Sequence, residues 1–169
     1  MNGLRLPRAP GTYALLLRLE TGGELRIGQW GRKPFAPGWY VYIGSALGPG
    51  GLRARVGHHL RPATHPRWHI DYLRRAAEVR SVWFGADGQR REHEWARALA
   101  SAWRSGVAVE RFGCSDCGCP AHLYRATTRP SRAAFERELC AAEPDHPRLR
   151  SLNRAAPSRR ATETRSSEC

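Results

Sequence analysis

The sequence has almost no lysine. Lys33 is the only lysine among 28 basic residues, and all the others are arginines. A genome rich in G and C favours arginine over lysine. It does not explain why 28 basic residues face only 15 acidic ones, which leaves a formal net charge of +13. Arginine presents a planar fork of donors that matches phosphate, so this excess predicts a polyanionic partner, and nucleic acid in particular.

Long apolar runs are also missing. No window approaches the 18 apolar residues of a membrane-spanning helix. The first ten residues contain two arginines and two prolines, and they lack the apolar stretch of a signal peptide. We therefore expect a cytoplasmic protein with no membrane partner.

Cysteines are few and odd in number: Cys114, Cys117, Cys119, Cys140 and Cys169. An odd number with three crowded together argues against a disulfide framework, and it favours free thiols or metal ligands in a reducing compartment.

Four possible zinc ligands, three thiols and one imidazole, lie within nine residues: Cys114, Cys117, Cys119 and His122. The pair Cys114 and Cys117 has the spacing of a zinc knuckle, but a further ligand two residues later strains a tetrahedral site. We expect partly buried thiols around a tight loop. Structural zinc, and with it a zinc-stabilised interaction domain, is the less favoured alternative.

The hydrophobic pattern predicts an α+β fold with a small central antiparallel β-sheet flanked by helices. Strands are predicted at 12–19, 24–28, 38–45 and 78–85, with edge strands at 107–113 and 122–127. Helices are predicted at 52–61, 69–77, 89–105 and 131–143, the last with Ser131 as its N-cap. A turn at 21–23 should return 24–28 antiparallel to the first strand, and 31–38 should be a loop because it holds two prolines and two glycines.

The length of 169 residues suits one domain. We expect an N-terminal extension at 1–10, the main domain at 11–127 and a C-terminal helix at 128–143. Residues 144–169 are polar and rich in arginine and serine, so they should form a basic disordered tail.

Two short tyrosine motifs and the helix after them resemble the GIY-YIG nuclease superfamily. Gly-Thr-Tyr ending at Tyr13 and Tyr-Ile-Gly beginning at Tyr42 are similar to its two half-motifs. A basic helix opening at Leu52 follows the second half-motif, as in that family. Aligned on this leucine, the family's catalytic arginine falls on Arg55, and the polar residue four positions later falls on His59.

A later segment and two longer phrases extend the resemblance. His93-Glu94-Trp95-Ala96 resembles the segment that carries the family's metal-binding glutamate, which makes Glu94 the match. The run from residue 11 to about 127 is similar to a less characterised bacterial and archaeal subgroup. In that subgroup the phrases at 68–73 (WHIDYL) and 117–123 (Cys-x-Cys-x-x-His-Leu) recur in similar form.

The resemblance implies a GIY-YIG-type fold and a metal-dependent endonuclease that hydrolyses DNA phosphodiester bonds in repair, recombination or processing. It implies one divalent ion, Mg²⁺ or Mn²⁺, at Glu94. The implied catalytic residues are Tyr13, Tyr42, Arg55, His59 and Glu94.

The residue types suit this chemistry on their own. Arg55 and His59 are four positions apart, so both project from one face of a helix. An arginine can clamp phosphate, a histidine can exchange a proton near neutral pH, and one carboxylate is enough to hold Mg²⁺ with its waters. The general base is one of Tyr13, Tyr42 and His59.

Several alternatives stay open at this stage. His58 competes with His59, and Glu92 competes with Glu94. Tyr40 shares a strand face with Tyr42 and serves either packing or substrate contact. His69 and Asp71 either support the site or merely begin a helix. The tyrosines and arginines could also be strand aromatics and a solvated basic face, in which case the chain would be a catalytically weak or inactive nucleic-acid-binding module of the same fold.

Overall fold

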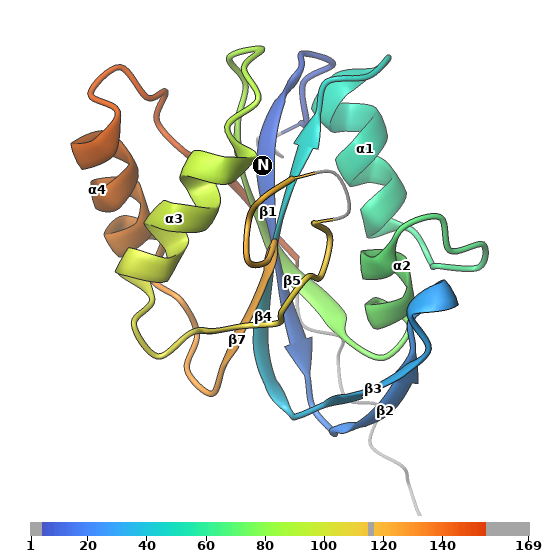
Figure 1. Cartoon of the computed structure of the whole chain (residues 1–169). Helices are drawn as coiled ribbons and strands as arrows, with labels where there is room; N and C mark the ends of the chain where they lie inside the picture. The colour runs from blue at the N-terminus through green and yellow to red at the C-terminus, as the bar shows by residue number, and fades with distance from the viewer. Residues whose placement is uncertain (1–4, 115–116, 155–169) are drawn as a thin grey trace, which may run out of the picture.

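A six-stranded antiparallel sheet with helices on both sides forms the centre of the computed structural model, which describes residues 5–114 and 117–154 (Figure 1). The strand order is β6-β7-β4-β1-β5-β8, and β2 and β3 form a separate two-stranded ladder. The strands are β1 (Gly11–Leu19), β2 (Gly23–Arg26), β3 (Arg32–Phe35), β4 (Gly38–Ala46), β5 (Glu78–Gly85), β6 (Val107–Ala108), β7 (Leu123–Ala126) and β8 (Arg150–Asn153). The helices are α1 (Gly51–Leu60), α2 (His69–Leu73), α3 (Glu92–Ala102) and α4 (Arg132–Ala142). The predicted α+β class with a central antiparallel sheet is confirmed.

The sheet is buried on both faces, which explains why β1 is apolar at nearly every position. Leu15 and Leu17 pack with α1 and α2, whereas Ala14 and Leu16 on the other face pack with α3 and α4. Alternate residues of a strand point to opposite faces, so a strand covered on both sides needs apolar residues at both. Figure 1 shows the two helix pairs on opposite sides of the sheet.

Strand β4 follows the same alternation and places its two tyrosines. Val41 and Ile43 face α3 and α4. Tyr40 and Tyr42 lie on the face covered by α1 and α2, as expected from their spacing. Tyr40 is 1% exposed and donates its hydroxyl to the carbonyl of Ala36 at 2.6 Å, so it is a packing residue.

The predicted pairing of residues 24–28 with the first strand is wrong. Strand β2 pairs with β3, which occupies part of the 31–38 segment predicted to be a loop. Strand β1 cannot pair with β2 because its two edges are hydrogen-bonded to β4 and β5. Pro34 is tolerated in β3 because a two-stranded ladder leaves one edge of each strand unpaired.

The predicted disordered tail is wrong for residues 144–154. Strand β8 pairs with the edge of β5, and this pairing satisfies the backbone N–H and C=O groups of β8. Amino-acid composition alone does not show such a pairing. Leu149 is buried with the α3 and α4 core, and buried His146 accepts a hydrogen bond from Trp95 Nε1 at 2.9 Å. Residues 155–169 of the predicted tail lie outside the described residues.

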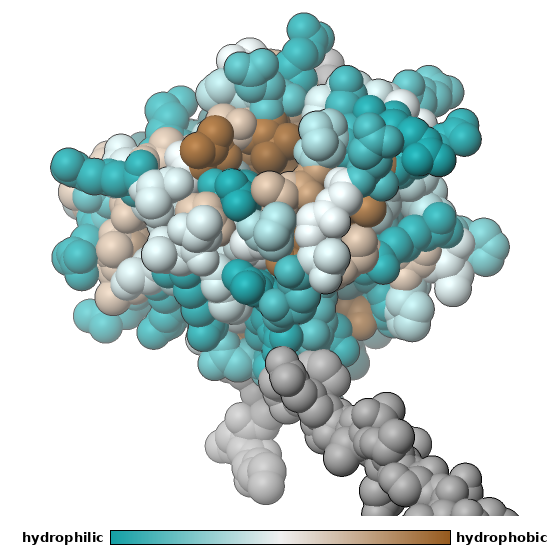
Figure 2. All heavy atoms as spheres, turned by 90° about the horizontal axis from the view of Figure 1, so that it is seen from below, coloured by the Kyte–Doolittle hydropathy of each residue, from teal (hydrophilic) through white to brown (hydrophobic). Residues whose placement is uncertain are grey.

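The helices are shorter than predicted at two places, since α2 ends at Leu73 and α3 covers only 92–102. The predicted N-cap of α4 is confirmed, because the Ser131 hydroxyl accepts a hydrogen bond from the backbone N–H of Ala134 at 3.3 Å. Within residues 5–114 and 117–154, no helix has both the length and the apolar character needed to cross a membrane. Figure 2 shows that the face seen from below is mostly hydrophilic, with hydrophobic side chains gathered near its upper middle and a few more scattered to the right.

Candidate functional site

A cavity of about 330 Å³ opens where β1, β4, α1 and the start of α3 meet. Its walls include Tyr13, Tyr42, Arg55 and Glu92, together with His122 from the segment before β7. Residues that are up to about 110 positions apart in the sequence therefore surround one space. Four of the predicted catalytic residues lie in or directly behind these walls.

The two tyrosines lie on neighbouring strands with their ring centroids 6.5 Å apart. Tyr13 is paired in the ladder with Gly44, the glycine that follows Tyr42 and Ile43. A Cβ atom at position 44 would lie 2.6 Å from the Tyr13 hydroxyl and 2.7 Å from its ring carbon Cζ. Glycine is needed here because the phenol of Tyr13 lies directly against the backbone of β4.

The Tyr13 hydroxyl is hydrogen-bonded to His59 Nε2 at 2.9 Å. His59 comes from α1 and is 1% exposed, and its other ring nitrogen, Nδ1, lies 3.3 Å from Asp71 Oδ1. A carboxylate accepts, so Nδ1 carries the proton and Nε2 is the acceptor for the tyrosine. Burial lowers the pKa of His59, which keeps the ring neutral and able to receive a proton.

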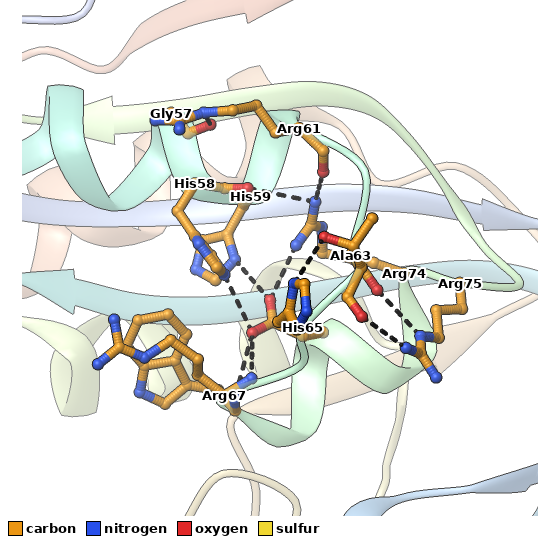
Figure 3. Close-up of polar contacts among 12 residues, drawn as sticks. Gly57, His58, His59, Arg61, Ala63, His65, Arg67, Arg74 and Arg75 are labelled. Atoms are coloured by element: carbon orange, nitrogen blue, oxygen red, sulfur yellow. Dashed lines mark hydrogen bonds and ion pairs between the residues drawn. The ribbon is translucent and has the colours of Figure 1, made fainter.

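Asp71 anchors this chain of hydrogen bonds. Its carboxylate is fully buried and accepts from five donors: His58 Nε2, His59 Nδ1, Arg74 Nη1 and the backbone N–H groups of Arg67 and Trp68. Figure 3 shows His58 and His59 extending from α1 in the same direction, with Arg74 beside them. Burial alone would raise the pKa of Asp71, but these hydrogen bonds hold it well below its ordinary value, so the group stays ionised.

Two arginines hold the segment between α1 and α2 in place. Arg75 donates to the carbonyls of Ala63 at 2.9 Å and Thr64 at 3.0 Å, and Arg74 donates to the carbonyl of Arg61 (Figure 3). Since these contacts fix the backbone that carries Arg67 and Trp68, they also fix two of the donors to Asp71. Asp71 therefore lies in the first turn of α2 and also accepts hydrogen bonds from His58 and His59 of α1.

Arg55 lies half-buried on α1, one turn before His59. Its guanidinium carbon is 4.3 Å from the centre of the Trp68 ring, a cation–π contact that holds it at the cavity wall. Arg55 also borders a neighbouring hollow of about 310 Å³, which His58, Arg67 and Trp68 line as well. The two histidines therefore differ: His59 reaches Tyr13, and His58 faces the neighbouring hollow.

The carboxylate in the cavity wall belongs to Glu92, not to Glu94. Glu92 is 8% exposed, and its Oε1 lies 3.3 Å from Arg90 Nη1. Glu94 is not among the cavity residues, and its Oε2 is buried with no hydrogen-bond partner in the described part of the chain. Two helical positions differ by about 200° around the axis, so only one of the two glutamates can face the cavity.

Both tyrosines are neutral phenols in the resting site. Burial raises the pKa of Tyr13 well above its ordinary value; Tyr42 adds to this and Arg55 opposes it. Burial likewise raises the pKa of Tyr42, with Glu92 adding and Arg55 opposing. A free phenolate is therefore disfavoured at either tyrosine.

Among the described residues, two groups of side chains are close enough to hold a metal ion. The first is His58, His59 and Asp71. The Asp71 carboxylate already accepts hydrogen bonds from both histidines and from Arg74. The second is His93, Cys117, Cys119 and His122.

The second group differs from the four candidate ligands that the sequence offers within residues 114–122. Cys114 is not part of it; its thiol lies 3.5 Å from the carbonyl of Phe112. His93 takes that place from α3, and no local spacing in the sequence links His93 to the cysteines.

Searches of curated proteins and of solved structures returned no significant match. A protein-family model, described as a domain of unknown function, DUF123, matches residues 12–142, a span that includes every residue of the cavity and of the two candidate metal clusters. The chain belongs to the DUF123 family.

Proposed function

We propose that the protein is a metal-dependent endonuclease of GIY-YIG type that hydrolyses DNA phosphodiester bonds. The observation that carries this proposal is the Tyr13 hydroxyl, which lies in a cavity wall and is hydrogen-bonded to a buried His59–Asp71 pair. Arg55 and Glu92 complete the set of groups that phosphodiester hydrolysis requires. The net charge of +13 supports a nucleic-acid substrate.

Adjacent placement of the two tyrosine half-motifs also supports the nuclease proposal. Tyr13 and Tyr42 lie on neighbouring strands, and α1 brings Arg55 and His59 to the same face of the sheet. These are the relations that the resemblance to the GIY-YIG superfamily leads one to expect.

Tyr13 activates the attacking water through His59. As the oxygen of the water attacks phosphorus, the water gives a proton to the Tyr13 oxygen, and the Tyr13 proton moves to His59 Nε2. The P–O bond to the leaving strand breaks, and the leaving oxygen takes a proton from solvent. The resulting imidazolium is stabilised by the ionised Asp71 at Nδ1. This relay explains why a phenol with a raised pKa can serve as a base, since no free phenolate has to form.

Arg55 stabilises the charge that develops on the phosphate. Its guanidinium is held against Trp68, so its position is fixed before the substrate arrives. An arginine fork can donate two parallel hydrogen bonds to two phosphate oxygens. The phosphate therefore sits between Arg55 and Tyr13.

Glu92 fits the role of ligand to one divalent ion, Mg²⁺ or Mn²⁺. It is the carboxylate in the cavity wall, it is largely buried, and about 330 Å³ of space beside it leaves room for the several waters that Mg²⁺ keeps. When bound, the ion supplies positive charge that stabilises the leaving oxygen. Its binding would displace Arg90 from Glu92.

The neighbouring hollow beside Arg55 gives the DNA strand a path. Arg67 lines it and offers a phosphate partner, and its guanidinium lies 5.5 Å from the centre of the Trp68 ring, which lines the hollow as well. DNA affinity should fall with salt because basic side chains displace counterions from the phosphates.

The test is cleavage of single-stranded, duplex and branched DNA with and without Mg²⁺ or Mn²⁺, comparing Glu92→Gln with Glu94→Gln. Both changes remove one charge from the same turn of α3, so they are matched. We expect cleavage by the native chain to require the metal, to fall at least about a hundredfold in Glu92→Gln and to persist in Glu94→Gln. Salt-sensitive DNA binding without cleavage of any substrate would instead identify a nucleic-acid-binding module of the same fold.

A further inference from the structure

Next to the cavity, four metal-binding side chains from two distant segments meet. His93 lies in the first turn of α3, and Cys117, Cys119 and His122 lie in the segment that leads into β7. One ligand atom from each lies within 4.8 Å of all the others. We propose that these four residues bind one zinc ion.

The distances between ligand atoms suit a zinc tetrahedron. His93 Nδ1 lies 2.9 Å from Cys119 Sγ, and His122 Nε2 lies 3.4 Å from Cys117 Sγ. Zn–S bonds of about 2.3 Å and Zn–N bonds of about 2.0–2.1 Å separate the ligands of a tetrahedral site by about 3.3–3.8 Å. Side-chain shifts of less than about 1 Å would therefore bring all four atoms within bonding distance of one zinc ion.

The donor set selects zinc by its chemistry. Two thiolates and two imidazoles are a common ligand set for structural zinc, and the two thiolate charges neutralise the ion. Mg²⁺ prefers oxygen ligands and an octahedral shell, so it would not compete for this site. The four protein ligands close the shell and leave no open position, which makes the site structural.

Backbone contacts prepare the site before the ion arrives. The His122 N–H donates to the carbonyl of Phe112 at 2.9 Å, and the His122 carbonyl accepts from the N–H of Ile43 in β4 at 2.8 Å. The Arg111 N–H donates to the carbonyl of Pro120 at 2.8 Å, which closes the loop at its base. These bonds fix His122 on the sheet, so the ion would tie α3 to an already anchored segment.

Zinc at this position would also orient Glu92. His93 Nδ1 faces the sulfur, which turns Nε2 toward Glu92 Oε1, 3.9 Å away. A carboxylate behind a metal-bound histidine is a common orienting arrangement. Cys117 and His122 belong to the cavity wall as well, so the ion would connect this part of the wall to the first turn of α3.

Metal analysis of the full chain tests the site. The chain is purified without added metal, or stripped with a chelator and reloaded with Zn²⁺, and its zinc content is measured by elemental mass spectrometry. We expect about one zinc ion per chain, a loss of at least about tenfold in zinc content in Cys119→Ser and His93→Ala, and full content in Cys114→Ser. Cys114 is the matched control because it is a neighbouring thiol outside the quartet.

Cobalt reconstitution of the native chain gives a second readout that does not depend on whether a variant folds. Co²⁺ bound by two thiolates and two imidazoles should show thiolate-to-metal charge transfer and the strong visible bands of a tetrahedral ion. Substoichiometric zinc after reloading, absence of these bands, or loss of zinc from Cys114→Ser equal to that from Cys119→Ser would overturn the inference. Zinc binding and DNA cleavage are measured separately, so a negative result for the zinc site does not refute the nuclease proposal, and the reverse also holds.

Discussion

Replacing Gly44 with alanine should disable the site without unfolding the protein. The added Cβ would lie 2.6 Å from the Tyr13 hydroxyl and 3.2 Å from Tyr42 Cε1. An ordinary contact begins at about 3.4 Å, so the Tyr13 hydroxyl must move by about 0.8 Å. Because the ring is 1% exposed and enclosed, that movement must distort its 2.9 Å hydrogen bond to His59.

The expected size of the effect follows from this displacement. Overpacking of a buried site costs about 1–3 kcal/mol of unfolding free energy. Misplacing a reacting group by about 1 Å costs about a hundredfold in rate. Urea unfolding and single-turnover cleavage measure the two effects separately.

Gly57→Ala is the matched control for this substitution. Gly57 lies in the middle of α1, and the nearest heavy atom to its added Cβ is Arg61 Nη2 at 3.9 Å. This change should stabilise the helix by about 0.5–1 kcal/mol and leave cleavage intact. A Gly44→Ala variant with native stability and native rate would refute the placement of Tyr13 against the β4 backbone.

Two further predictions concern the groups behind Tyr13. His59 must be neutral to accept a proton and burial lowers its pKa, so the cleavage rate should rise with pH through a midpoint below the ordinary histidine value of about 6.5; a midpoint above that value would remove His59 as the acceptor. Asp71→Asn leaves Arg74 and His59 facing an amide, and it should cost about 3–5 kcal/mol of unfolding free energy at neutral pH. Because the folded-state pKa of Asp71 is lowered, its contribution is present above the unfolded value of about 3.9 and is lost as the pH falls below it, so native and variant stabilities measured by urea unfolding should converge in acid. Equal stability at neutral pH would contradict the role of Asp71 as the anchor.

Short sequence patterns predict which segments form strands and which face each side chain lies on. A continuous apolar run predicts β1, and the two-residue spacing of Tyr40 and Tyr42 in β4 places both on one face. Strand pairing depends on which edges remain free, and no short window carries that information. For the same reason β8 was missed: its partner, β5, lies about 70 residues earlier in the sequence.

In the candidate site, too, sequence spacing places residues of one helix but not residues that meet through packing. The four-residue spacing of Arg55 and His59 was enough to place both on one face of α1. Alignment on the family's glutamate segment favours Glu94, whereas the buried positions of Trp95 and Ala96 favour Glu92 as the residue that faces the protein interior. Glu92 lies three and four residues before them, so it shares the buried side of α3.

His93 illustrates a site residue that sequence spacing could not supply. In the sequence, the crowded zinc-ligand candidates are the four within residues 114–122. His93 lies 24 residues before Cys117, and only the packing of α3 beside the segment before β7 brings them together.

The most direct measurement of the central claim is single-turnover DNA cleavage by Tyr13→Phe beside Tyr40→Phe. Each change removes one buried hydroxyl from the same face of the sheet, but the Tyr40 hydroxyl binds the Ala36 carbonyl outside the cavity. Loss of a general base predicts a fall of about 10²–10⁴ in the rate of Tyr13→Phe, and Tyr40→Phe should stay within about threefold of the native rate. Native cleavage by Tyr13→Phe would contradict the account.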